Sequence, residues 1–271
     1  MILTYVVFTD LDGTLVDHDS YSYEAARPAI DLLKQKGIPL IFCTSKTRAE
    51  LEVYVEELDC HHPFISENGG GIFVPEGYFD IDIDFDHKVG NYDVIELGTG
   101  YSALKDTLME ISKGSGIEII NFGKMTTEEV SKDTGLDIRS AELAKMRDYD
   151  EAFRIIDEDE NKASKMKELI GAAGYNYTRG GRYWHIIGNN DKGKAVRILT
   201  DIYRQQFTDI TTIGLGDSQN DLPMLESVDI SVLVQKPGGS HDPSITDTKI
   251  KRVEGIGPIG WGNAINEIIG R

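Results

Sequence analysis

Hydrophobic positions in the first third of the chain form two alternating patterns, short continuous runs and helical stripes. The apolar runs at 3–9, 38–43 and 64–66 predict buried strands, because each is rich in β-branched or aromatic residues. The segments 22–36 and 48–58 between them carry apolar residues at helical spacing and predict helices. Strand, helix, strand, helix, strand is typical of a parallel, doubly wound sheet.

The middle of the chain breaks this alternation and predicts a separate α+β unit. The alternation resumes with a helix that Asp191 caps and continues to a last helix at 258–269. We therefore predict an α/β fold, a doubly wound parallel-sheet core at 1–87 and 188–271 with an inserted α+β cap domain at 88–187. Within the insertion the predicted strands are 92–97, 117–122, 153–156 and 183–187, and the predicted helices are 102–112, 128–133, 142–147 and 163–172.

The net charge of the chain limits the kinds of molecule that it can bind as a partner. The 271 residues include 28 Lys and Arg against 46 Asp and Glu, a formal net charge of −18. This charge argues against nucleic acid or an anionic membrane as the main partner, because either would repel the surface. A hydrophobic content of 40% is enough for a folded core.

The sequence gives no indication of membrane insertion or export. No apolar run reaches the ~20 residues of a membrane span, and the N-terminus shows no charged leader followed by an apolar segment. The two cysteines, Cys43 and Cys60, are too few for a disulfide framework. We therefore expect a cytoplasmic enzyme without a nucleic acid or membrane partner, and make no prediction of its oligomeric state.

Two carboxylates directly follow the first predicted strand. Asp10 and Asp12 stand two residues apart, so their side chains project to the same side, at the strand end where open α/β sheets bind ligands. We interpret Asp10 as a nucleophile that attacks phosphorus and Asp12 as the acid and base. The alternative is a simple turn, because Asp and Gly are common at the ends of strands.

Polar groups follow the second strand as well. Thr44 ends that strand, and Ser45 and Lys46 precede the next helix, whose N-terminus is a natural phosphate site. The alternative is that these residues only cap the helix. Lys192, in the first turn of the helix after the insertion, opposes the helix dipole, so an anion should compensate it.

A third set follows the strand predicted at 210–215. Asp217, Asn220 and Asp221 supply oxygen ligands of the kind that Mg²⁺ prefers. By contrast, the aspartates that alternate with apolar residues at 80–86 are interpreted as a strand with one solvated face. A calcium loop would need Gly where Phe85 stands.

These stretches, in this order, resemble the haloacid dehalogenase-like phosphatases across the whole chain. The resemblance implies an aspartyl-phosphate mechanism with Asp10 as the nucleophile. Asp12 would protonate the leaving alcohol and then activate water, while its backbone carbonyl contacts the metal. Thr44 and Lys192 would hold the phosphoryl oxygens.

The resemblance also implies a Mg²⁺ cofactor bound by Asp10 and Asp217, with Asn220 and Asp221 in support. Only about thirty residues separate the first two motifs, and a helix fills most of them, so the cap must follow the third strand. That arrangement is similar to the branch of the family that includes many sugar-phosphate phosphatases.

A closer resemblance lies within the insertion. Residues 177–185 resemble the substrate loop of mannosyl-3-phosphoglycerate phosphatases, and so do 146–153, 44–47 and 67–70, although Ala152 stands where that family usually has Pro. The substrate-binding residues expected from these stretches are Ser45, Lys46, Asn68, Gly69, Arg179, Gly180, Gly181, Arg182 and His185.

The chemistry of the loop at 177–185 fits this role. Gly180 and Gly181 allow the backbone to approach an anion, and Arg179 and Arg182 could fork onto a glycerate carboxylate. The alternative is a β-hairpin with Gly-Gly at its turn and its arginines in solvent, and for His185 plain structural packing.

We therefore predict a Mg²⁺-dependent phosphatase that converts mannosyl-3-phosphoglycerate to mannosylglycerate and phosphate in compatible-solute synthesis. Its partner would be a small phosphorylated sugar-glycerate. The alternatives are glucosyl-3-phosphoglycerate, a general sugar phosphate, or a phosphosugar-binding regulator without turnover.

Overall fold

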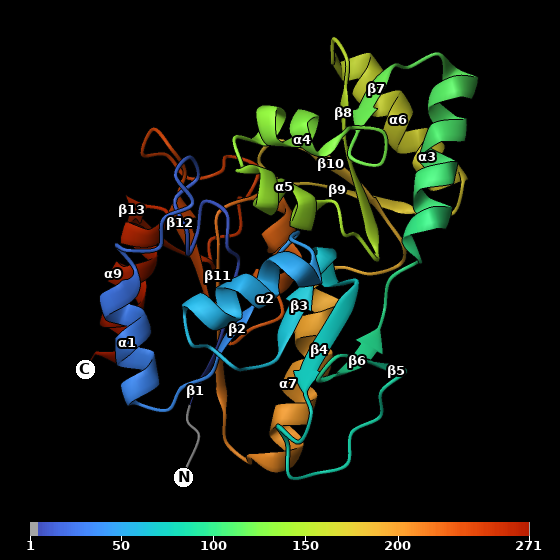
Figure 1. The fold of residues 1–271 in the computed structure, drawn as a ribbon. Coiled ribbons are helices and arrows are strands. Elements are labelled where there is room, and N and C mark those ends of the chain that lie inside the picture. Colours follow the sequence, from blue (N-terminus) through green and yellow to red (C-terminus); the bar gives the residue numbers. More distant parts are fainter. Residues whose placement is uncertain (1–4, 271) are drawn as a thin grey trace.

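The computed structural model describes residues 5–270, which form a core and a cap (Figure 1). The core is built on a five-stranded sheet in which every pair of neighbouring strands is parallel. Its strands, in spatial order, are β13 (Lys251–Ile256), β12 (Ile230–Gln235), β11 (Thr211–Gly216), β1 (Tyr5–Thr9) and β2 (Leu40–Phe42). The predicted fold class is confirmed.

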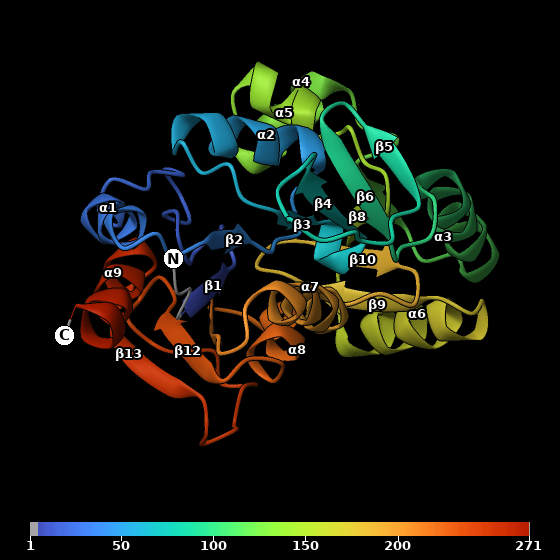
Figure 2. The ribbon, with the colours of Figure 1, turned by 90° about the horizontal axis from the view of Figure 1, so that it is seen from below.

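Helices cover both faces of this sheet (Figure 2). Helices α1 (Arg27–Gln35), α2 (Arg48–Glu57) and α9 (Pro258–Ile269) pack on one face. Helices α7 (Lys192–Gln206) and α8 (Leu222–Leu225) pack on the other. Helix α1 begins five residues later than predicted, because residues 22–23 are irregular and residues 24–26 form a turn.

The cap is built on an antiparallel sheet inserted between the third strand and α7. Its strands, in spatial order, are β7 (Ile119–Asn121), β8 (Asp150–Ile155), β10 (Trp184–Ile187) and β9 (Asn176–Arg179). Helices α3 (Tyr101–Ser115) and α6 (Glu160–Ala172) share one apolar cluster with this sheet. Helices α4 (Thr127–Thr134) and α5 (Ile138–Ala144) share another, and α5 starts four residues before the predicted helix at 142–147 because Asp137 caps it.

A second antiparallel sheet lies beside the core. Its strands, in spatial order, are β3 (Phe64–Ser66), β4 (Gly71–Pro75), β6 (Tyr92–Glu96) and β5 (His87–Val89). The predicted domain boundary at 87/88 falls within this sheet. The strand expected at 80–86 is wrong: this segment forms an irregular loop, and its Ile81 and Ile83 pack on the core without a partner strand. Among the described residues, no helix is long and apolar enough to cross a membrane.

One buried carboxyl group of the core binds three backbone N–H groups of the cap. Glu67, in the turn η1 (Glu67–Gly69) after β3, accepts hydrogen bonds from the backbone N–H groups of Asp148 at 3.0 Å, Tyr149 at 2.7 Å and Asp150 at 2.9 Å. Burial and the neighbouring Asp150 raise the pKa of Glu67 to about 8, although Arg147 and the N–H donors oppose the shift. The Glu67 side chain thus binds the backbone at the start of β8.

This raised pKa makes a prediction about stability. The native protein binds a proton at Glu67 more tightly than the unfolded chain does, so Glu67 lowers the free energy of unfolding progressively as pH rises from 4.5 to about 8. We expect Glu67→Gln to flatten the fall in stability over that range, measured by urea unfolding at a series of pH values. The control is Glu110→Gln on the exposed side of α3, which should leave the slope unchanged. Parallel curves for wild type and Glu67→Gln would contradict the prediction.

Candidate active site

Asp10 and Asp12 follow β1 at the carboxyl edge of the core sheet. The N–H of Asp10 donates to the carbonyl of Leu215 at 2.9 Å, which holds the residue against β11, and the side chain is buried. Gly13 then turns the chain away with φ of +77°, a conformation that a residue with a side chain rarely adopts. A side chain there would also press on Asp217, because a Cβ would lie 3.2 Å from its Oδ2.

Lys192, the first residue of α7, joins two of the predicted acids. Its Nζ donates to Asp10 Oδ1 at 2.7 Å and to Asp221 Oδ1 at 2.6 Å, and the side chain is completely buried. Burial opposes the charge, yet the two carboxylates together raise the pKa of Lys192 above its ordinary value. The anion expected to compensate this lysine is therefore present within the protein itself.

Three buried carboxylates converge beside this lysine. Asp10, Asp217 and Asp221 each offer an oxygen, and these oxygens lie within 4.8 Å of one another. Burial and the nearby Asp221 raise the pKa of Asp10 well above its ordinary value and that of Asp217 to about 6. The cluster thus holds more negative charge than its surroundings offset.

This donor set fits a hard divalent cation. Carboxylate and amide oxygens are the ligands that Mg²⁺ prefers, and among the described residues the buried Oδ1 of Asn220 has no hydrogen-bond partner. Asp221 is fixed by the backbone, since its Oδ2 accepts from the N–H groups of Asp217 and Ser218, each at 3.0 Å. Residues 217–221 could therefore hold a cation together with Asp10.

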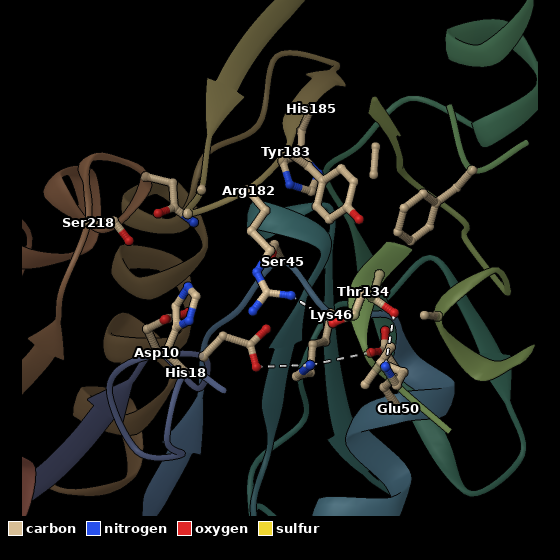
Figure 3. Close-up of a pocket in the computed structure, with 18 of the residues that line it drawn as sticks. Asp10, His18, Ser45, Lys46, Glu50, Thr134, Arg182, Tyr183, His185 and Ser218 are labelled. Atoms are coloured by element: carbon tan, nitrogen blue, oxygen red, sulfur yellow. Dashed lines mark hydrogen bonds and ion pairs between the residues drawn. The ribbon is translucent and has the colours of Figure 1, made fainter. Parts of the chain in front are cut away.

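Lys46 links the second motif to the first. Its Nζ lies 3.0 Å from Asp12 Oδ1 and 3.4 Å from Glu50 Oε1 (Figure 3). It is also 5.2 Å from the ring centroid of Tyr21 and 5.9 Å from that of Tyr54. Its backbone N–H donates to the buried hydroxyl of Thr44 at 3.3 Å. The capping box of Thr47 and Glu50 that the sequence predicts for α2 is present.

These groups border one cavity between core and cap. In Figure 3, Arg182, Tyr183 and His185 enter it from the cap, opposite Asp10 and Lys46 of the core. The predicted site residues that line it are Asp10, Asp12, Ser45, Lys46, Gly180, Gly181, Arg182, His185, Asp217 and Asn220. Lys192 and Asp221 lie beneath Asp10, in contact with it through the hydrogen bonds above.

Three predicted substrate residues lie elsewhere. Arg179 pairs with Glu158 at 2.7 Å and covers the ring of Trp184, on the far side of the hairpin β9–β10. Asn68 bonds to side chains of the protein, and Gly69 packs against the start of α7, where a Cβ would lie 2.2 Å from the carbonyl oxygen of Asp191. Their positions favour structural roles.

Sequence reasoning missed several residues of the cavity wall. His18 and Tyr21 come from the loop after the first motif, and Arg147 and Tyr183 come from the cap. Arg147 and Tyr183 fall within stretches that resemble the phosphatase family, which is the one signal that could have identified them. His18 and Tyr21 carry no comparable signal, because only the fold brings them to the cavity.

Comparison with known proteins agrees with this geometry. The chain matches the family model of haloacid dehalogenase-like hydrolases over residues 7–237. It is 66% identical to the glucosyl-3-phosphoglycerate/mannosyl-3-phosphoglycerate phosphatase of Methanococcoides burtonii, over 99% of this chain and 98% of that protein. It is 39% identical to the mannosyl-3-phosphoglycerate phosphatase of Pyrococcus horikoshii, over 84% of this chain and 90% of that protein.

The fold has solved counterparts as well. A protein from Thermoplasma acidophilum superposes with a TM-score of 0.69 at 18% identity, covering 99% of each chain. A buried aspartate at a strand end, a buried lysine and a cluster of acids thus occur here in a fold and sequence shared with known relatives. The chain belongs to the haloacid dehalogenase-like hydrolases.

Proposed function

We propose that this chain is a Mg²⁺-dependent phosphatase of glucosyl-3-phosphoglycerate and mannosyl-3-phosphoglycerate. The observation that carries the proposal is the cavity between core and cap, with Asp10 and its lysine at the base and the cations Lys46 and Arg182 in its walls. A phosphorylated glycerate has two anionic groups, and this cavity has cations at two places. The names of the relatives from Methanococcoides burtonii and Pyrococcus horikoshii support the same substrates.

The reaction proceeds in two steps. The carboxylate of Asp10 attacks phosphorus, the bond to the glycerate oxygen breaks, and Asp12 gives that oxygen its proton. Asp12 then takes a proton from water, whose oxygen attacks the phosphorus of the aspartyl phosphate. The products are the glycosylglycerate, inorganic phosphate and free Asp10.

The remaining residues hold charge in place. Lys192 and Thr44 bind the phosphoryl oxygens, where negative charge must be stabilised during transfer. Asp10, Asp217 and the backbone carbonyl of Asp12 hold Mg²⁺, with Asn220 and Asp221 in support. When bound, Mg²⁺ offsets the repulsion between the phosphate and the attacking carboxylate.

We assign the glycerate carboxylate to Lys46 and Arg182. The sequence suggested Arg179 as a second ligand of this carboxylate, but Arg179 points away from the cavity toward Glu158. Lys46 sits 3.0 Å from Asp12, close to where the leaving oxygen must lie. The glycerate carboxylate, whose carbon is three bonds from that oxygen, would therefore reach the ammonium group.

The first test is turnover of the two glycosyl-3-phosphoglycerates side by side, by wild type and Asp10→Asn. We expect wild type to release phosphate from at least one, and the variant to lose on the order of 10⁴-fold or more in kcat because the nucleophile is gone. Asp12→Asn should lose about 10²–10⁴-fold, the usual contribution of a positioned acid. Undiminished activity of Asp10→Asn would refute the assignment.

A second test concerns the metal. Mg²⁺ that binds only the native protein should raise the Tm, by the equivalent of about 2.7 kcal/mol at a hundred times Kd. We expect Asp217→Asn to lose most of this shift, measured by thermal denaturation with and without Mg²⁺. The control, Asp201→Asn, changes an exposed aspartate on α7 and should keep the full shift. Equal shifts in wild type and Asp217→Asn would mean that the ion binds elsewhere.

A third test separates the two arginines. Arg182→Ala should raise KM for the glycosyl-3-phosphoglycerates about tenfold or more, because a charge-assisted hydrogen bond is lost. Arg179→Ala should raise it much less. With para-nitrophenyl phosphate, which lacks a carboxylate, Arg182→Ala should have a much smaller effect. Equal losses for both arginines, or for both kinds of substrate, would contradict the assignment.

A further inference from the structure

A fully buried carboxylate, Asp150, lies where the cap meets the core. It stands at the start of β8 and accepts hydrogen bonds from three side chains. Arg147 forms an ion pair with its Oδ1. His185 Nδ1 and Asn68 Nδ2 each lie 3.0 Å from its Oδ2.

These partners determine the state of Asp150. Arg147 remains a cation at any ordinary pH, and the Asn68 amide nitrogen can only donate. Burial alone would raise the pKa of Asp150, but the charge of Arg147 and the contact with His185 hold it below its ordinary value. Asp150 is therefore ionised and can only accept hydrogen bonds.

The state of Asp150 in turn determines where His185 carries its proton. Because the carboxylate only accepts, His185 Nδ1 must carry a hydrogen and donate it. In the neutral ring, the lone pair then lies on Nε2. That atom faces the turn between β9 and β10, 4.0 Å from the place where a Cβ on Gly180 would lie, and both residues line the cavity.

A sugar bound in the cavity would need a hydrogen-bond acceptor such as this nitrogen. The cations of the cavity suit a phosphate and a carboxylate, but the hydroxyl groups of a sugar also donate hydrogen bonds. The acidic side chains Asp12 and Glu50 in the wall are already held by Lys46. Asp217 belongs to the proposed metal cluster. His185 Nε2 lies in the cap wall and is not part of that group of carboxylates.

We propose that Asp150 is a positioning residue: it holds His185 in the Nδ1–H form, so that Nε2 accepts a hydrogen bond from a hydroxyl group of the substrate's sugar. This inference rests on the proposed function. The same carboxylate connects to the core through Asn68, whose Oδ1 accepts from Asn220 Nδ2 at 3.3 Å. His185 is thus held by a chain of hydrogen bonds that begins at Asn220 of the core and runs through Asn68 and Asp150.

The first experiment reads the tautomer directly, by ¹⁵N NMR of His185 in the whole protein above neutral pH. We expect the Nδ1–H form in wild type. In Asp150→Asn, Arg147 keeps the amide oxygen on its own side, so the amide NH₂ takes the place of Oδ2. It then donates to His185 Nδ1 and leaves the Asn68 NH₂ without this acceptor. The ring should then change to the Nε2–H form. Wild type with its proton on Nε2 would overturn the inference.

The second experiment measures KM and kcat for glucosyl-3-phosphoglycerate, mannosyl-3-phosphoglycerate and para-nitrophenyl phosphate. Asp150→Asn should raise KM for the sugar substrates about tenfold, the effect of one lost hydrogen bond that leaves a buried group unpaired. The loss of kcat/KM with para-nitrophenyl phosphate, which has no sugar, should be several-fold smaller. Equal losses on all substrates would mean that Asp150 only stabilises the fold.

A double-mutant cycle supplies the control. His185→Asn keeps a donor for Asp150 but has no atom at the Nε2 position, so it should match the loss of Asp150→Asn. If both act through one hydrogen bond, the double variant should lose no more than either single variant. Additive losses would overturn the inference.

Failure of the proposed function would look different. In that case wild type would hydrolyse neither glycosyl-3-phosphoglycerate while still hydrolysing para-nitrophenyl phosphate. The NMR measurement would then still decide whether Asp150 sets the tautomer of His185. Normal turnover of the sugar substrates together with the wrong tautomer would refute the inference and leave the proposed function standing.

Discussion

The rest of the site depends on the buried ion pairs that Lys192 forms with Asp10 and Asp221. The lysine is completely buried between Asp10 and Asp221, so removing it would leave two carboxylates without the cation that they share. Breaking a buried ion pair in this way typically costs 3–5 kcal/mol. The lysine must therefore arrive at one point from a distant part of the chain, and the fold is arranged to bring it there.

Two features of the backbone achieve this. The parallel order places β1 between β2 and β11, so the polar residues after all three strands meet at one edge. The start of α7 then presses against the turn after β3, where only the missing side chain of Gly69 leaves room for the carbonyl of Asp191. Packing of backbone against backbone thus sets the height of Lys192 above the sheet, and no flexible side chain needs to adjust.

The sequence predicted the site residues that follow the ends of strands. It did not predict on which face of a sheet a side chain lies, where that face depends on how two strands pair. Asp10, Thr44 and Asp217 were identifiable because the carboxyl ends of parallel strands share one edge. Arg179 was not, because in the antiparallel pair β9–β10 it stands directly opposite Trp184 and shares its face of the sheet. Only the register shows that this face lies away from the cavity.

An edge strand and a loop were also not predicted correctly from the sequence. Strand β13 has a mainly polar sequence, Lys251-Arg252-Val253-Glu254, because an edge strand at the surface needs few apolar residues, so its pattern gave no signal. The segment 80–86 has the alternation of a strand but no partner to pair with. Asp150 was overlooked for a related reason: its role depends on Asn68 and His185, which are 82 and 35 residues away in the sequence, and no local pattern brings them together.

The charge of −18 is less of an obstacle to an anionic substrate than it first suggests. At physiological ionic strength, exposed charges are screened beyond about 8 Å, so the surface acts weakly on a ligand inside the cavity. The balance in and directly beneath the cavity matters more. Arg147 in the cavity wall is paired with Asp150. The other three cations, Lys46, Arg182 and Lys192, stand against five carboxylates, Asp10, Asp12, Glu50, Asp217 and Asp221. The excess is two negative charges, which one divalent cation at the aspartate cluster would offset. Charge balance thus favours binding the metal before the phosphate.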